Sequence, residues 1–172
     1  LNNQPVEFGY ANADGKSFVS GSSLYFTAYD WSTWPNKVYL NELSLSDGTL
    51  TRTIPLSELV PAGNTQKILD GVSDFIIILQ SNSDWRNHVY KVNKTSLVTQ
   101  ELNGVANELP DGFLWNSWTL DPTRECIWLA GYNNGTGGYG EPGYKYFKFR
   151  ISNGELLQAV SLGQQYINFQ SV

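Results

Sequence analysis

The chain has 172 residues, of which 41% are hydrophobic and 14% aromatic, and its 11 basic and 16 acidic side chains give a formal net charge of −5. This composition excludes intrinsic disorder, and the length allows one domain with a sizeable core. The chain has no cluster of Lys or Arg that could bind a phosphate backbone. Its longest apolar run, residues 75–79, is too short to cross a bilayer. Nucleic acid is therefore excluded as a partner, and no membrane span is expected.

Three short apolar strands recur at a fixed spacing. They are predicted at residues 24–29, 75–80 and 126–131, so their first residues lie 51 positions apart each time. Each follows a turn, and an earlier strand is predicted before that turn, near residues 16–20, 66–70 and 115–120. A repeat at this period is typical of an architecture built from equivalent units.

A hairpin follows each apolar strand. Residues 43–50, 90–97 and 149–156 align without gaps across their turns, and the closing strands end at Leu56, Leu102 and Leu162. The pairs Asp47-Gly48 and Asn153-Gly154 are turn chemistry, because these residue types tolerate a positive φ. Apolar and polar positions around the turns alternate with a period of two, as in half-buried strands.

The sequence thus predicts one all-β domain, residues 1–172, made of three four-stranded antiparallel repeats. The repeats cover about residues 11–56, 66–102 and 115–162, and residues 163–172 begin an incomplete fourth unit. The best helical candidate is a single turn at residues 57–60, before Pro61.

Four short strands repeated at this period resemble the blades of a β-propeller. The run Val89-Tyr90-Lys91-Val92-Asn93, followed by Ser96-Leu97, is similar to the loose repeats of YncE-like and quinoprotein-like propellers. The chain has no Trp-Asp blade ending, no kelch di-glycine and no sialidase-type Asp box. The alternative is a sandwich or barrel whose periodicity is accidental.

Three repeats raise a question of closure, because propellers have about four to eight blades. The resemblance implies that the chain is part of a larger propeller, that two copies close a six-bladed ring, or that repeats stack into an open assembly. Self-association, or pairing with the remainder of a propeller, is therefore expected.

The loops between the second and third strands of each repeat, at residues 30–36, 81–88 and 132–143, are the predicted binding surface. They place aromatic rings among Asn, Asp and Gly, a combination that suits a protein or a glycan. The predicted binding residues are Trp31, Trp34, Asn36, Trp85, Asn87, Tyr132, Asn133 and Tyr139. Alternatively, the loop tryptophans fold back over the blade edges. Trp118 and Trp128 lie on strands and are predicted to be core residues.

Two features favour a secreted or cell-surface glycoprotein. The sequence has no Met and opens at Leu1, as expected if a signal peptide was removed, although proteolysis or a partial chain would give the same start. The tripeptides Asn93-Lys94-Thr95 and Asn134-Gly135-Thr136 are N-glycosylation acceptor sequences in predicted turns.

No catalytic motif is present, and neither a metal nor a cofactor is predicted. His88 and Cys126 are the only residues of their types, whereas structural metal sites draw on several such ligands. His88 is predicted to be a solvated loop residue and Cys126 a core thiol. The main hypothesis is a non-catalytic, extracellular recognition or self-assembly module that uses its loops or blade flanks.

Two enzymatic alternatives stay open. Four carboxylates recur near strand ends, at Asp30, Asp74, Asp84 and Asp121. A pair of them facing each other across a rim would suit a carbohydrate hydrolase or lyase whose missing blades come from another chain. Asp74 and Asp121 lie in turns, where local hydrogen bonding is the simpler role. A quinoprotein-type oxidoreductase ranks third, by fold analogy alone.

Overall fold

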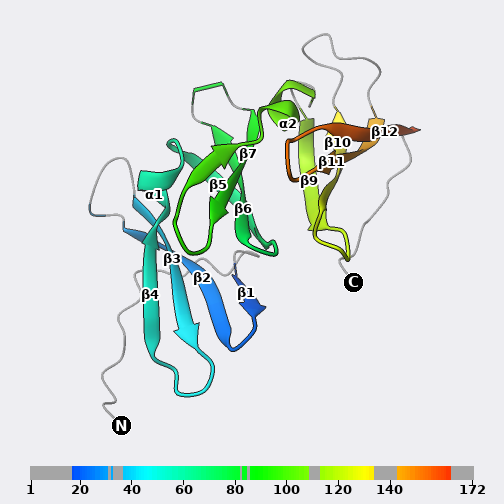
Figure 1. Ribbon diagram of the computed structural model, residues 1–172. Coiled ribbons are helices and arrows are strands. Elements are labelled where there is room, and N and C mark those ends of the chain that lie inside the picture. The colour runs from blue at the N-terminus through cyan, green and yellow to red at the C-terminus, as the bar shows by residue number, and fades with distance from the viewer. Residues whose placement is uncertain are drawn as a thin grey trace. The chain divides into compact units, whose positions relative to one another are not determined.

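The computed structural model describes residues 17–30, 32, 37–81, 83–84, 86–108, 113–133 and 143–163, at a few of which only the backbone is described (Figure 1). The chain forms two compact units, Leu1–Ala62 and Gly63–Val172. Among the described residues, no helix combines the length and hydropathy that a membrane crossing requires.

The first unit contains one four-stranded antiparallel sheet, the first sheet, in the order β1-β2-β3-β4. Its strands are Ser17–Ser20, Ser23–Asp30, Lys37–Ser44 and Leu50–Pro55. Helix α1, Leu56–Leu59, follows directly and buries Leu56. The predicted helical turn before Pro61 is therefore present, one residue earlier than expected.

The second unit contains two further four-stranded antiparallel sheets. The second sheet consists of β5 (Gly63–Asp70), β6 (Asp74–Ser81), β7 (Asn87–Asn93) and β8 (Thr99–Glu101). The third consists of β9 (Phe113–Leu120), β10 (Cys126–Asn133), β11 (Gly143–Arg150) and β12 (Leu156–Gly163). Within each sheet, strands adjacent in sequence are adjacent in space. The prediction of an all-β protein with three four-stranded antiparallel sheets is confirmed.

Helix α2, Asn103–Glu108, joins the second and third sheets and was not predicted. Its six residues are too few to show a helical period in the sequence. The helix contacts β7 and β12 (Figure 1). Its Val105, and Leu102 just before it, are completely or almost completely buried. These two side chains anchor the helix in the core.

The core of the second unit lies where one face of the second sheet packs against one face of the third. Ile76, Ile78 and Val89 of the second sheet are fully buried, and the third sheet contributes an equally apolar face. That face consists of Trp118, Ile127, Leu129, Phe147 and Phe149. Burial of each such side chain contributes about 1.5–3 kcal/mol relative to an exposed position.

Two polar contacts tie the same sheets together. The Lys67 ammonium of β5 donates a hydrogen bond of 2.8 Å to the carbonyl oxygen of Trp118 on β9. Burial lowers the pKa of Lys67. The Arg124 guanidinium, in the β9–β10 turn, lies 2.9 Å from a carboxylate oxygen of Asp70 at the end of β5. The edge strand β5 is thus joined to β9 and to the turn after β9 by polar bonds near the apolar core.

Hydrogen bonds across the three hairpin turns define which residues are equivalent. The amide of Ser44 donates to the Thr49 carbonyl, and the amides of Asn93 and Arg150 donate in the same way to Val98 and Glu155. The residue before each acceptor has a positive φ, namely 72° at Gly48, 58° at Leu97 and 73° at Gly154. The hairpin of the second sheet therefore aligns at residues 92–99, and the predicted alignment at 90–97 is wrong by two positions. Leu97 thus adopts a positive-φ backbone conformation that is normally found at glycine or asparagine.

This alignment shows that the second and third sheets pack through non-equivalent faces. Ser23, Asp74 and Cys126 pair with the three equivalent turn residues, so the strand period is 51 and then 52. In this register Ile76, Ile78 and Val89 correspond to Trp128, Ala130 and Tyr146 of the third sheet. The core, however, contains Ile127, Leu129, Phe147 and Phe149, on the opposite face. Front-to-back packing of this kind is typical of successive repeats, because one surface meets a different surface of its neighbour.

We predict that Gly104→Ala destabilises the protein. A Cβ at Gly104 in α2 would overlap the backbone of Gly154, with the carbonyl carbon at 2.9 Å and the oxygen closer still. Alanine normally stabilises a helix by about 1 kcal/mol relative to glycine, whereas overpacking costs about 1–3 kcal/mol. We expect thermal unfolding to show a lower melting temperature for Gly104→Ala and little change for the neighbouring Asn103→Ala. A rise for Gly104→Ala would contradict the close approach of helix and turn.

Candidate functional site

The face of the third sheet that points away from the second carries four aromatic side chains. On β10 and β11, Trp128 pairs with Lys148, Ala130 with Tyr146, and Tyr132 with Tyr144. These residues alternate with the core residues, so strand geometry places them on the opposite face. Val160 of β12 pairs with Tyr146 and extends this face. We call it the outer face, made of Trp128, Tyr132, Tyr144, Tyr146, Lys148 and Val160.

The rings of the outer face contact one another. Trp128 and Tyr146 meet edge to face, with centroids 5.4 Å apart and planes at 82°. The Lys148 ammonium lies 5.1 Å from the centroid of the Trp128 ring, within cation–π range. Tyr132 and Tyr144 form a second pair, with centroids 5.2 Å apart. The result is a surface with two pairs of aromatic rings and one cation, which lies over Trp128.

The outer face is open to solvent at its centre. Trp128 and Val160 each keep 37% of their surface exposed, whereas Trp118 on the core face keeps 2%. The prediction that Trp118 is a core residue is confirmed, and the same prediction for Trp128 is wrong. Alternation with a period of two separates the faces of a strand but does not identify the one that a neighbouring sheet covers.

The structure brings one predicted binding residue to this face. Tyr132 belongs to β10 and not to the loop, and it contacts Tyr144. Asn87 begins β7 and is only 8% exposed. Asn133 ends β10, and its side chain is outside the described part. Outside the described residues altogether lie Trp31, Trp34, Asn36, Trp85, Tyr139 and the sequon residue Asn134.

Sequence reasoning missed Trp128, Tyr144 and Tyr146 as surface residues. The signal was present: Tyr144 and Tyr146 alternate with Lys145 and Phe147, and hence lie on one face of their strand. Only the packing of the second sheet on the other face shows that this one stays open.

Asn93, the other predicted glycosylation site, ends β7 and shapes its turn. Its Oδ1 atom accepts hydrogen bonds from the amides of Thr95 and Ser96, at 3.1 and 2.9 Å. Its Nδ2 atom donates to the Ser73 carbonyl at 3.4 Å. In this structure the side chain therefore stabilises the turn that carries the sequon.

His88 lies within β7, and its side chain is 17% exposed. Its Nδ1 atom lies 2.6 Å from Glu101 Oε1 on β8, and its Nε2 atom lies 3.0 Å from Asp84 Oδ2. The prediction of a solvated loop histidine is wrong. Sequence placed Asp84 nearby but gave no sign of Glu101, which reaches His88 only through the pairing of β7 with β8.

The surroundings shift the pKa values of both rings in this cluster, His88 and Tyr90. Burial lowers the pKa of His88, but the hydrogen bonds and charges of Glu101 and Asp84 outweigh it, so the pKa is raised above 6.5. Burial, with Glu101 and Asp84 adding to it, raises the pKa of Tyr90 to about 12. Since both ring nitrogens of His88 already contact carboxylates, neither is open to a substrate in this arrangement.

Other carboxylates near strand ends serve their own turns. Asp30 accepts hydrogen bonds from the amide and the hydroxyl of Ser32. Asp121 accepts two from the amides of Glu125 and Cys126, at 2.9 and 3.0 Å, which confirms its local role. Over the ranges that the structure describes, no group of three or more His, Cys, Asp or Glu is arranged to hold a metal ion.

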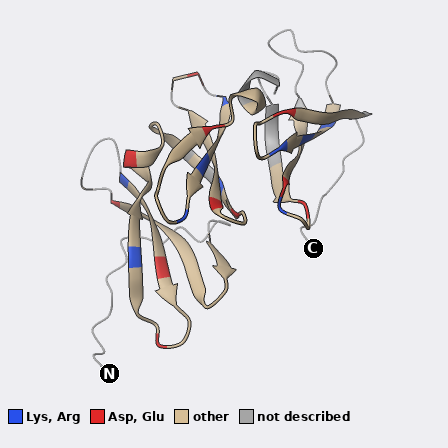
Figure 2. Cartoon of the chain, in the orientation of Figure 1, with Lys and Arg blue, Asp and Glu red and all other residues tan. Residues whose placement is uncertain are grey.

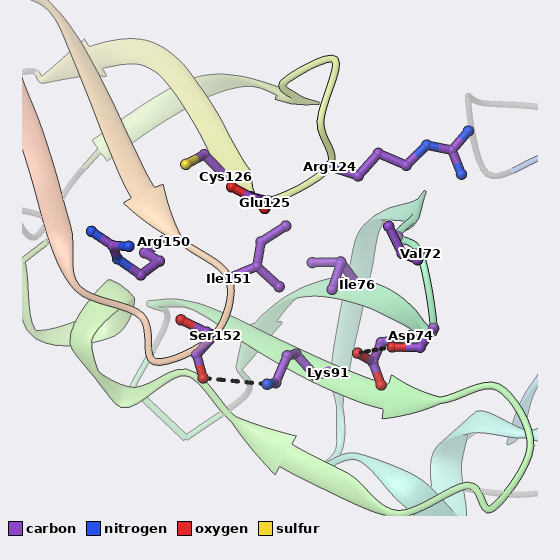
Figure 3. A pocket seen from close by; sticks show the side chains of 12 residues that line it. Val72, Asp74, Ile76, Lys91, Arg124, Glu125, Cys126, Arg150, Ile151 and Ser152 are labelled. Atoms are coloured by element: carbon purple, nitrogen blue, oxygen red, sulfur yellow. Dashed lines mark hydrogen bonds between the residues drawn. The ribbon is translucent and has the colours of Figure 1, made fainter.

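A cavity of about 440 Å³ lies between the turns at one end of the second and third sheets (Figure 3). Its three cations are already bonded: Arg124 contacts Asp70, Arg150 contacts Glu155 at 3.1 Å, and Lys91 donates to the Ser152 carbonyl at 3.3 Å. Figure 3 shows the side chains of Ile76 and Ile151 between these groups. The cavity thus collects packing residues and paired charges.

Charges elsewhere are mixed in the same way. Figure 2 shows basic and acidic positions interspersed along the turns and strands of each unit. The Lys94 ammonium in the β7–β8 turn, for example, lies 2.7 Å from a carboxylate oxygen of Asp70 at the end of β5. The outer face is therefore distinguished from the rest of the second unit by its aromatic rings, not by its charge.

Cys126 is buried at the start of β10, as predicted for a core thiol. Burial, and secondarily the charge of Asp121, raise the pKa of this thiol. Since the thiolate is the reactive form, we predict that a disulfide reagent at pH 8 modifies native Cys126 at least about tenfold more slowly than the unfolded chain.

The matched control is Thr95→Cys in a Cys126→Ser background, since Thr95 is exposed in a turn of the second sheet. This variant is expected to react at similar rates in the native and unfolded states. Native Cys126 reacting as fast as the control thiol would contradict its burial.

No protein-family model matches the chain, and no curated protein matches its sequence. Among solved structures, the chain is similar to the Pyrococcus horikoshii acylaminoacyl peptidase, whose fold is propeller-like, with a TM-score of 0.55 and 7% sequence identity. The alignment covers 87% of this chain and 25% of that one, so the chain spans about a quarter of the peptidase. At this identity the likeness concerns the fold alone.

Proposed function

We propose that this chain is a non-catalytic recognition or assembly module that binds a protein partner through the outer face. The observation that carries the proposal is the exposure of Trp128 and Val160, at 37% each, on a face that carries two pairs of aromatic rings. Tryptophan and tyrosine dominate the binding energy of many protein interfaces, because they supply large, rigid contact area.

The internal packing of the second unit suggests the kind of partner. The face of the second sheet equivalent to the outer face, which carries Ile76, Ile78 and Val89, is fully buried against the third sheet. Since the outer face occupies the equivalent position in the next repeat, we expect a similar kind of surface to cover it. We therefore infer that the partner presents the apolar flank of another β-sheet.

The outer face differs from its buried equivalent in ways that suit a separable partner. It has Trp128 and Tyr146 where the second sheet has Ile76 and Val89, and the tyrosine hydroxyl can stay solvated when the face is free. Lys148, which corresponds to Lys91 of the second sheet, lies over the Trp128 ring. A carboxylate or an aromatic ring at the edge of the partner's flank would complement it.

Two features of the fold support the propeller reading that underlies this proposal. Three four-stranded antiparallel sheets follow one another along the chain, and the second and third pack front to back. The similarity to a peptidase of propeller-like fold agrees with both. A secreted or cell-surface location remains part of the proposal and rests on the two sequons.

A binding role is favoured over the carbohydrate hydrolase or lyase. The carboxylates of Asp30 and Asp121 bond to their own turns, and those of Asp84 and Glu101 bond to His88. A glycosidase needs two carboxyl groups facing each other across an open space. The observed hydrogen bonds account for these four without such a role.

The proposal predicts that binding depends on Trp128. Peptides would be selected from a displayed random library against the wild-type chain and tested by titration against Trp128→Ser and Tyr146→Ser. We expect binders that form extended, apolar segments, and a loss of affinity of about 30-fold or more with Trp128→Ser, the size of an interface hot spot.

The control is Val98→Ser, since Val98 is 68% exposed in the second unit but lies away from the outer face. It should leave affinity unchanged. Sedimentation velocity on the wild-type chain tests whether a second copy is the partner, with Trp128→Ser shifting any oligomer to monomer. The proposal would be overturned if the selected peptides bound Trp128→Ser as tightly as the wild-type chain and no oligomer depended on Trp128.

A further inference from the structure

Both ring nitrogens of His88 contact carboxylates, which is unusual for a neutral histidine because it has only one N–H to donate. Its Nδ1 atom is 2.6 Å from Glu101 Oε1 and its Nε2 atom is 3.0 Å from Asp84 Oδ2. A neutral imidazole has one N–H and one lone pair, whereas an imidazolium has two N–H donors. Two ionised carboxylates at these distances are both satisfied only by the imidazolium.

We propose that protonated His88 is a clamp that fastens the outer strand β8 to the β6–β7 turn, and that loss of its proton releases one of the two attachments. Glu101 is the last residue of β8, and Asp84 lies in the turn that precedes β7. The ring between them joins these two surface segments.

The clamp acts on the most weakly held strand of the second sheet. Strand β8 has three residues and pairs with β7 alone. Short edge strands open at low free-energy cost. Directly after Glu101, the Leu102 amide donates to the Val89 carbonyl at 2.8 Å, and the Leu102 side chain is buried. The clamp therefore adjoins the point where the chain enters the core, and its release is expected to stay local.

The groups facing His88 come from the elements around it. Glu101 comes from β8 and Asp84 from the β6–β7 turn. The Oδ1 atom of Asp84 accepts a hydrogen bond from the Arg86 amide. On β7 itself the Tyr90 ring stacks near the imidazole, with centroids 6.4 Å apart. On β6 the paired residue is Leu79, which does not titrate. The pKa of Tyr90, about 12, keeps it neutral throughout the range in which His88 titrates.

The sign of the pH dependence follows from the direction of the shift. Since the pKa of His88 is raised in the folded state, its stabilising contribution is complete below the unfolded value of about 6.5 and is lost as pH rises through the folded value. Hydrogen bonds from the Arg86 amide and from His88 lower the pKa of Asp84, so its charge persists below pH 3.8. While both carboxylates are ionised, the clamp is thus complete below about pH 6.5 and is lost as pH rises through the pKa of His88.

The experiment uses the fact that His88 is the only histidine, so its NMR signals need no assignment. At pH 5.5 both ring nitrogens are expected to have imidazolium shifts, and the titration midpoint is expected above 6.5. Hydrogen exchange at residues 99–101, corrected for the intrinsic effect of pH, is expected to quicken as pH rises past that midpoint. The buried amides of β6 should not change.

Variants separate the clamp from a merely structural histidine. Glu101→Gln and Asp84→Asn are each expected to lower the midpoint of His88, with Glu101→Gln having the larger effect, while His88→Gln makes exchange at residues 99–101 fast at all pH values. Glu125→Gln, in an exposed turn of the third sheet, is the matched control and should leave the midpoint unchanged.

Three results would overturn the inference. The first is a titration midpoint of His88 at or below 6.5. The second is a neutral imidazole at pH 5.5 with the proton on Glu101 instead. The third is a His88 midpoint that Glu101→Gln does not change. Since the NMR midpoint is measured on the folded chain, a variant that fails to fold is replaced by the alternative carboxylate variant, Asp84→Asn.

Discussion

The front-to-back packing of the second sheet on the third is the contact on which the second unit depends. Ile76, Ile78 and Val89 have no exposed surface, and what buries them is the core face of the third sheet. The two faces that meet are not equivalent in the repeat. In these two sheets the contact is therefore made by two different faces. Repeating such a contact would add further sheets in the same direction.

The aromatic outer face is a direct consequence of this packing. Covering Ile127, Leu129 and Phe149 on one side of the third sheet leaves Trp128 and Tyr146 on the other. The repeat places them where the second sheet has buried aliphatic residues. Rings with polar atoms tolerate both solvent and an apolar partner, whereas isoleucine and valine suit permanent burial. The choice of residues thus matches the different exposure of the two sheets.

Polar groups in the second unit mostly stabilise turns and edges. Asp121 binds two amides of its own turn, Asn93 binds two of its hairpin, and Asp70 accepts from both Lys94 and Arg124. The cavity between the turns is lined by cations that are already bonded. His88 also joins two segments, but it differs because its charge depends on pH within the range where histidine titrates.

Much of the architecture was predictable from sequence. The three apolar strands, the strands before them and the hairpins after them follow from alternation and turn chemistry, which are local properties of the chain. Local signals fail where the structure is locally atypical. Leu97 adopts the conformation of Gly48 and Gly154, which moved the predicted hairpin by two residues, and α2 is too short to show a period.

What the sequence determined by itself was the number, type and order of the sheets, because strand periodicity and turn residues are recorded in neighbouring positions. Tertiary structure alone decided which face of each strand is covered. It thereby made Trp118 a core residue and Trp128 a surface one, and it brought Glu101 to His88. Both outcomes depend on contacts between residues far apart in the chain, and a period of two is the same whichever face a neighbouring sheet covers.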